Sequence, residues 1–313
     1  MNGRINDAPA PAAELAARRN RVISGLPSAK LDCVLIAALP NVRYLTGFTG
    51  SNALAVLHAS GTILFTDPRY IAQAAHETAC EVRLSEKSLY KGAHQYIRRK
   101  RWRRVGFEKN RISFGAHAEL KEGLSGKARL EPVVNLVEEH RMIKSEWEIE
   151  AVRLSVLLNS QAFSAALANL RPEMTERDLA AELEYQLRLH GADRAAFDTI
   201  VASGLRSAFP HARPTGLPLE ADQLLLIDMG AMRNGYASDM TRVVHLGRIS
   251  SEKRQFYNAV LQAQQAAIAA VRPGVKASQV DQAARDTLKA HGLDQLFAHS
   301  TGHGLGLEIH EPP

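Results

Sequence analysis

The chain has 313 residues, of which 45% are hydrophobic and 23% charged, so it can form a sizeable core and is not a disordered chain. At ~150 residues per domain, this length favours two domains. The formal net charge of +6 equals the six positive charges between Arg98 and Arg104, so the rest of the chain is balanced. Because the excess charge is local, we expect no nucleic-acid partner.

Cysteine usage and hydropathy both favour a cytoplasmic location. Cys33 and Cys80 form no CxxC motif, which predicts neither a disulfide framework nor a thiolate metal site and fits a reducing compartment. The sequence has no run of 18 apolar residues that would predict a transmembrane helix. Its first 20 residues also lack the apolar region of a signal peptide, so we expect no membrane partner.

Helix-like and strand-like patterns alternate over residues 1–135, which predicts an α/β domain. The predicted helices are 12–23, 68–79, 89–100 and 114–122, and the predicted strands are 31–37, 53–57, 62–66 and 104–107. Asp67 followed by Pro68 is typical of a helix start, because Asp caps the free N–H groups and Pro fits the first helical position.

Longer helical patterns dominate residues 136–313, which predict a second domain of mixed α and β structure. The predicted helices are 145–170, 175–190, 251–271 and 278–291, and the predicted strands are 197–204, 224–229 and 236–246.

The stretch 224–242 is the most informative, because four apolar residues end in Asp228 and a second carboxylate, Asp239, follows a turn signal. Asn234-Gly235 predicts a type I′ hairpin, which makes the two Asp residues diagonal neighbours ~7–8 Å apart on one face. The apolar run predicts a strand buried on both faces, where an ionised Asp needs a partner or a metal. A shared divalent cation and a solvated surface hairpin both remain open from these residues.

Histidines gather near the end of the sequence. His299, His303 and His310 lie within twelve residues, and the glycines among them argue against a zinc-binding helix. Such glycines let the backbone pass close to a ligand or another strand. His211 follows the strand 197–204 in a loop, where site residues concentrate. A lone His predicts only a hydrogen-bonded residue, but these histidines together with the Asp pair favour a site.

Several segments, taken in order, carry a family resemblance. They are FDTIVASG (197–204), PHA (210–212), LIDMGA with GYASDMTR (226–231, 235–242) and HSTGHGLGLEIHEPP (299–313), with NVRYLTGFTGSNA (41–53), LFTDPRYIAQA (64–74) and RMIKSEWEIEAVR (141–153) before them. Together they resemble the Xaa-Pro peptidases, aminopeptidase P and prolidase. This implies an α+β protein, with a creatinase-like N-terminal α/β domain (1–135) and a pita-bread catalytic domain (136–313) that lacks its last strands.

The resemblance also implies a hydrolase site. Asp228, Asp239 and His303 match ligands of two divalent metal ions, commonly Mn²⁺, Co²⁺ or Zn²⁺, with Asp239 bridging the pair.

His211, His299 and His310 match catalytic histidines that line the substrate and stabilise the tetrahedral intermediate. The implied reaction is metal-assisted attack of water on the carbonyl that precedes proline, at the N-terminus of a peptide. The expected partners are proline-containing peptides and a second copy of the chain.

The family has two further ligands, both glutamates, nearer its C-terminus, and the sequence ends at Pro313 before either. We therefore expect weak metal binding and little hydrolysis by these 313 residues. A fragment, a truncated gene product and a degenerate relative all remain open.

Two other functions are weighed against the peptidase. A creatinase-like, metal-free amidinohydrolase would not need Asp228, Asp239 and His303, so their presence argues against it. A non-catalytic pita-bread binding module is the other alternative, and the basic stretch around Trp102 would supply its surface.

Overall fold

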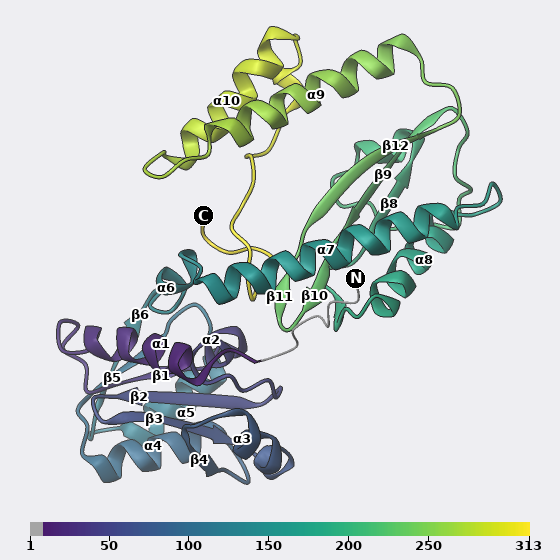
Figure 1. Ribbon diagram of the computed structural model, residues 1–313. Helices are drawn as coiled ribbons and strands as arrows, with labels where there is room; N and C mark the ends of the chain where they lie inside the picture. The colour runs from purple at the N-terminus through teal and green to yellow at the C-terminus, as the bar shows by residue number, and fades with distance from the viewer. Residues whose placement is uncertain (1–8) are drawn as a thin grey trace. The chain divides into compact units, whose positions relative to one another are not determined.

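A computed structural model describes residues 9–313, and the chain divides between Trp147 and Glu148 into two units (Figure 1). Each unit has its own sheet structure and its own hydrophobic core. The predicted domain boundary after residue 135 stays a prediction. Among the described residues, no helix is both long enough and apolar enough to span a bilayer.

The N-terminal unit alternates helices and strands, as the sequence predicts. Its helices are α1 (Ala12–Gly25), α2 (Leu39–Thr46), the 3₁₀ helix η1 (Pro68–Tyr70), α3 (Ile71–Glu77), α4 (Leu89–Lys100), α5 (Phe114–Leu124) and α6 (Glu138–Met142). Its strands are β1 (Cys33–Ile36), β2 (Ala53–His58), β3 (Gly61–Thr66), β4 (Glu81–Leu84), β5 (Arg104–Glu108) and β6 (Arg129–Val133).

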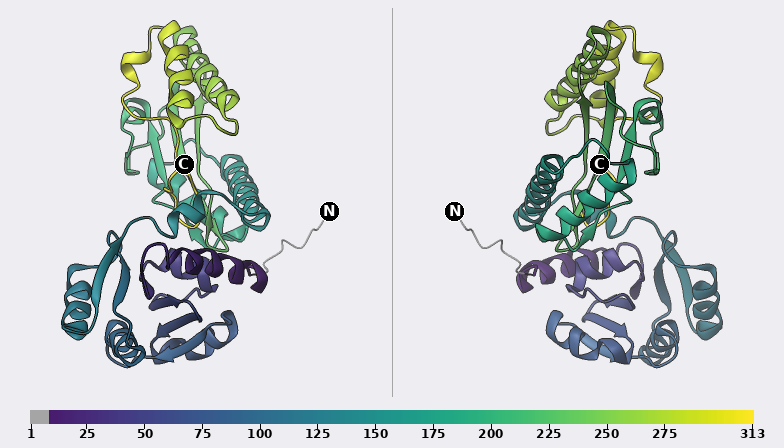
Figure 2. Two further views of the ribbon diagram at one scale, coloured as in Figure 1. Left: turned by 90° about the vertical axis from the view of Figure 1, so that its left-hand side faces the viewer. Right: turned by 90° about the vertical axis from the view of Figure 1, so that its right-hand side faces the viewer.

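These six strands form one sheet in the order β4-β3-β2-β1-β5-β6, in which β2 alone runs antiparallel to its neighbours. Side chains alternate between faces along a strand. Leu35 and Val56 accordingly pack with Ile97 of α4 and Leu120 of α5. Helices α1 and α2 cover the opposite face (Figures 1 and 2).

The predicted helix 68–79 is wrong in one respect, because it divides into η1 and α3. Asp67 caps the start as expected, since its carboxylate accepts a hydrogen bond from the Arg69 amide (3.0 Å). Tyr70 then leaves helical geometry (φ −106°, ψ 6°), and its hydroxyl lies 2.6 Å from Ser51 Oγ. Helices α2 and α6 and strands β4 and β6 were not predicted from the sequence.

The C-terminal unit is built around a short sheet and long helices. Its helices are α7 (Glu146–Ala168), which begins just before the division, α8 (Glu176–Leu189), the 3₁₀ helix η2 (Gly204–Ala208), α9 (Ser251–Ala270), α10 (Ala277–Ala290) and the 3₁₀ helix η3 (Asp294–Leu296). Its strands are β7 (Arg194–Ala195), β8 (Ile200–Ser203), β9 (Gln223–Met229), β10 (Ala231–Arg233), β11 (Tyr236–Ala237) and β12 (Met240–Leu246). Helices α9 and α10 lie side by side (Figures 1 and 2).

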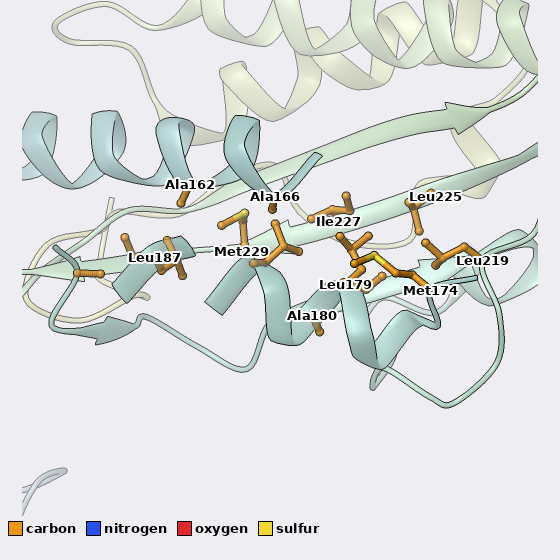
Figure 3. Packing of buried hydrophobic residues seen from close by; sticks show 14 of the residues in the cluster. Ala162, Ala166, Met174, Leu179, Ala180, Leu187, Leu219, Leu225, Ile227 and Met229 are labelled. Carbon is orange, nitrogen blue, oxygen red and sulfur yellow. The ribbon is translucent and has the colours of Figure 1, made fainter. Parts of the chain in front are cut away.

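Strand β9 is the centre of the antiparallel sheet β12-β9-β8 and faces a core formed with α7 and α8 (Figure 3). The prediction that this strand is buried on both faces is wrong. Leu225, Ile227 and Met229 are buried against the helices, whereas Leu226 and Asp228 on the other face are half-buried. Asp228 therefore lies at the edge of the core with access to ligands.

The hairpin register agrees with the prediction. Asn234 and Gly235 have positive φ angles of 49° and 73°, as a type I′ turn requires. Thr241 pairs with Asp228 and Met240 with Met229, so Asp239 lies diagonally across from Asp228. The predicted strand 236–246 is interrupted, however, because it pairs as β11 and then as β12, with Ser238 and Asp239 between them.

Gly230 makes this interruption possible, and we expect Gly230→Ala to destabilise the protein. A Cβ atom at Gly230 would lie 2.3 Å from the backbone oxygen of Ser238 and 2.6 Å from the Phe197 ring. Overpacking of this kind costs about 3 kcal/mol. Urea unfolding of Gly230→Ala and of Gly216→Ala, where nothing lies within 4 Å, measures the difference. Equal stability of the two variants would contradict the expected clash.

Candidate active site

The two aspartates of the hairpin are held differently. Asp228, near the end of β9, accepts a hydrogen bond from Thr241 Oγ1 on β12, with Oγ1 2.8 Å from Asp228 Oδ1. Asp239 lies in the gap between β11 and β12, where its side chain is 26% exposed. Because Asp239 lies outside the paired strands, its side chain is not held to one face of the sheet, and both carboxylates can face the same ligand.

The pKa of Asp228 depends on several of the predicted site residues. Burial raises the pKa of the Asp228 carboxyl, and the neighbouring charge of Asp239 raises it further. The hydrogen bond from Thr241 and the interactions with His211 and His303 lower the pKa of Asp228. Asp228 therefore shares one electrostatic environment with Asp239, His211 and His303.

His303 contacts the second aspartate directly. Its Nε2 lies 3.3 Å from Asp239 Oδ2, while its Nδ1 lies 2.9 Å from the backbone oxygen of Gly304. The ring of His310 packs against the ring of His303 with centroids 4.4 Å apart. His299 is placed differently, because its Nδ1 lies 2.9 Å from the Ser300 oxygen and its ring contacts Phe297.

The donor chemistry of this cluster suits a divalent cation, although the arrangement is not that of a closed metal site. Within residues 9–313, no group of three His, Cys, Asp or Glu side chains is arranged to hold a metal ion. Two carboxylates and one imidazole are nevertheless the ligand types that Mn²⁺, Co²⁺ and Zn²⁺ accept. A cation would also neutralise the repulsion between Asp228 and Asp239 that raises the pKa of Asp228.

The segment after His303 is fixed to the hairpin through its backbone. Gly304 and Glu311 form an antiparallel bridge, and the Ala237 amide donates to the oxygen of Gly306 at 2.7 Å. A Cβ atom at Gly304 would lie 2.4 Å from the backbone oxygen of Pro312, so only glycine allows the two backbone segments to pass this close. This close approach is the physical reason for the glycine directly after His303.

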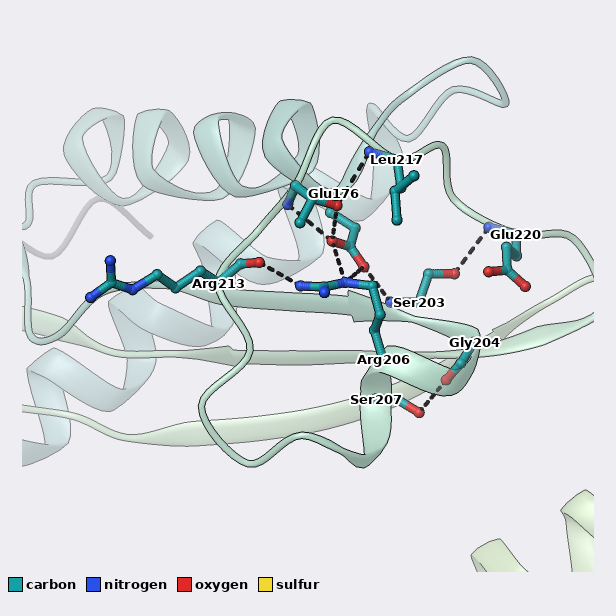
Figure 4. Close-up of polar contacts among 9 residues, drawn as sticks. Glu176, Ser203, Gly204, Arg206, Ser207, Arg213, Leu217 and Glu220 are labelled. Atoms are coloured by element: carbon teal, nitrogen blue, oxygen red, sulfur yellow. Dashed lines mark hydrogen bonds and ion pairs between the residues drawn. The ribbon is translucent and has the colours of Figure 1, made fainter.

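The loop that carries His211 is held by a buried carboxylate that sequence reasoning missed. Glu176, at the start of α8, is 1% exposed and accepts hydrogen bonds from the Ser203 amide (2.9 Å) and from Arg206 Nε (3.1 Å). The Thr215 amide (3.0 Å) and hydroxyl (2.7 Å) donate to its other oxygen. Figure 4 shows Ser203 and Arg206 beside the same carboxylate. We call Glu176, Ser203, Arg206 and Thr215 the Glu176 network; it holds both ends of the His211 loop.

No sequence signal marks Glu176 as functional, because a Glu in the first turn of a helix is common for its effect on the helix dipole. The capping box of α8, in which Thr175 and Asp178 exchange hydrogen bonds, marks this segment only as a helix start and does not involve Glu176. Only the fold brings this helix start next to the end of β8.

Comparison with known proteins agrees with this architecture. Residues 150–313 match metallopeptidase family M24, and residues 18–143 match the creatinase/prolidase N-terminal domain. The chain belongs to metallopeptidase family M24. The predicted fold class, with a creatinase-like domain followed by a pita-bread catalytic domain, and the predicted peptidase family are thereby confirmed for this M24 chain.

Relatives cover most of its length. The M24 chain is 38% identical over 284 residues to an uncharacterized peptidase from Bacillus subtilis, which covers 90% of this chain and 80% of that protein. It is 33% identical over 297 residues to an Xaa-Pro dipeptidase from Pyrococcus horikoshii, covering 94% and 82%. The solved structure of an Xaa-Pro dipeptidase from Bacillus anthracis superimposes with a TM-score of 0.91 at 31% identity, covering 96% and 84%.

Proposed function

We propose that this M24 chain hydrolyses the Xaa-Pro bond of short peptides with a divalent metal cofactor. The observation that carries the proposal is the contact of His303 with Asp239 beside Asp228, on a hairpin whose register places the two carboxylates diagonally. The names of its relatives, Xaa-Pro dipeptidases among them, supply the substrate class.

Each residue of the proposed site has a separate role. Asp228, Asp239 and His303 would hold the cations, for which Mn²⁺, Co²⁺ and Zn²⁺ are the candidates. When bound, the metal would act as a Lewis acid toward the peptide carbonyl.

The remaining histidines would act on the substrate. His310, packed on the His303 ring, and His211, close enough to affect Asp228, would donate hydrogen bonds to the carbonyl oxygen as negative charge develops there. His299 would line the substrate from the Phe297 side. Proline explains the need for a dedicated site, because its tertiary amide lacks the N–H that other sites recognise.

Release of free proline tests the substrate class. The assay compares Ala-Pro with Ala-Ala in the presence and absence of Mn²⁺, using the 313-residue chain and the full reading frame that encodes it. We expect Mn²⁺-dependent release of proline from Ala-Pro and none from Ala-Ala. We expect little of this turnover from the 313 residues alone, because they hold three of the five metal ligands that the family resemblance implies. If neither protein released proline from any Xaa-Pro peptide, the proposed function would be wrong.

The two alternatives predict different outcomes. A metal-free amidinohydrolase would release urea from a guanidino substrate without added cation. A nucleic-acid-binding module is disfavoured by the packing of Trp102, whose ring lies 4.8 Å from the His58 ring and 5.8 Å from the Tyr96 ring. Because this indole packs within the N-terminal unit, the basic stretch lacks an aromatic platform for bases.

The proposal also covers the oligomeric state of the protein and its location in the cell. Resemblance to the family favours a homodimer in the cytoplasm, and light scattering of the purified protein tests the dimer.

A further inference from the structure

The segment with His299 and His303 is bound to helix α10 by an acidic side chain. Asp281 Oδ1 accepts hydrogen bonds from the amide (2.9 Å) and the hydroxyl (2.8 Å) of Thr301. Its other oxygen accepts from Arg285 Nε (2.7 Å). The hydrogen bonds from Arg285 and Thr301 lower the pKa of Asp281, so the acceptor is charged at neutral pH. The anchored residue stands two positions before His303.

Arg285 adds two more bonds to the same segment. Its Nη1 donates to the oxygen of Phe297 (3.0 Å) and its Nη2 to the oxygen of His299 (2.7 Å). The guanidinium also lies 4.8 Å from the centroid of the Phe297 ring, which contacts the His299 ring. A rigid planar fork is suited to holding two carbonyls at a fixed spacing.

The other side of His303 is anchored to the hairpin. The backbone of Gly304 bridges to Glu311, and Gly306 accepts from Ala237 of β11. Only Gly302 and His303 separate Thr301 from Gly304, and Gly302 takes the left-handed conformation (φ 71°) that the turn between the two anchors requires. The position of the His303 ring therefore depends on both anchors at once.

We propose that Asp281 and Arg285 are positioning residues that hold His303 against Asp239 and His310. Their hydrogen bonds go to each other and to residues 297–301, not to Asp228 or Asp239, so they act on His303 through this segment. The inference depends on the proposed function only where metal affinity is the readout, because the position of the ring can be measured separately.

The experiment compares Asp281→Asn and Arg285→Lys with Asp286→Asn. Asp286 is exposed on the same helix and accepts a hydrogen bond from Gln282 Nε2 (2.8 Å), which makes it a matched control. Nuclear magnetic resonance gives the exchange rate of the Thr301 amide and the proton contacts between the His303 and His310 rings. Equilibrium dialysis with Mn²⁺ alone gives metal affinity, also for His303→Ala and for Asp281→Asn/His303→Ala.

We expect faster Thr301 exchange in Asp281→Asn, weaker ring contacts in both test variants, and wild-type values in Asp286→Asn. Affinity for Mn²⁺ should fall ~10-fold in Asp281→Asn, as for other residues that orient a metal ligand. The double variant should bind like His303→Ala, because both changes remove the same interaction.

Two outcomes would overturn the inference. In the first, the His303–His310 contacts stay intact in Asp281→Asn although Thr301 exchanges faster, which would make the pair purely structural. In the second, His303→Ala loses Mn²⁺ but Asp281→Asn binds it normally, which would leave the proposed function standing without this support. If His303→Ala bound Mn²⁺ like the wild type, the metal assignment would fail and the ring contacts alone would decide the positioning role.

Discussion

Asp239→Asn is expected to lower the affinity for Mn²⁺ by well over ~100-fold and to abolish Mn²⁺-dependent proline release. Partners that merely orient a metal ligand contribute 10–100-fold, and Asp239 is proposed as a ligand itself. Its carboxylate is the one that contacts His303 and raises the pKa of Asp228. The amide removes the charge on which both the cation and the imidazole depend.

The free energy of unfolding of Asp239→Asn shows whether its loss of Mn²⁺ affinity comes from a lost ligand or from misfolding. Because Asp239 and Asp228 repel each other, Asp239→Asn should leave the free energy of unfolding unchanged or raise it. Glu184→Gln, an exposed change on α8, is the control for loss of a surface carboxylate. Normal Mn²⁺ affinity in a folded Asp239→Asn protein would exclude Asp239 as a ligand.

The hairpin is the part of the site that the sequence predicts well. Asn234-Gly235 has few alternative conformations, and a type I′ turn sets the pairing of every residue on both strands. The positions of Asp228 and Asp239 therefore follow from a local signal. Helical periodicity, which is also a local signal, predicts the bounds of α4, α5 and α10 to within a few residues.

What the sequence cannot show depends on contacts between distant segments. The apolar run before Asp228 is compatible with a strand covered on one face or on both. Only the packing of α7 and α8 determines which faces of β9 are buried. Glu176 and Asp281 look like ordinary acidic residues of helices, yet each binds backbone groups more than 19 positions away. Such roles require knowledge of which loop passes the helix.

Glu176→Gln is expected to destabilise the C-terminal unit by about 3 kcal/mol at pH 7, because it leaves the Arg206 partner and three further donors without a charged acceptor. One oxygen of the amide still accepts, but the NH₂ group that replaces the other would face N–H and O–H donors. Urea unfolding of Glu176→Gln against Glu184→Gln on the same helix measures the difference.

The dependence of this loss on pH identifies its cause. Burial acts to raise the pKa of Glu176, but hydrogen bonds from Ser203, Thr215 and Arg206 outweigh it and lower the pKa below its usual value. A carboxyl whose pKa is lower in the folded state stabilises the fold above its unfolded pKa of ~4.3, and this stabilisation disappears as pH falls through the folded pKa. The stability difference between wild type and Glu176→Gln should therefore be full at pH 7 and shrink below about pH 4. A difference that stayed constant down to pH 3 would mean that lost packing, and not the charged network around the His211 loop, accounts for the effect.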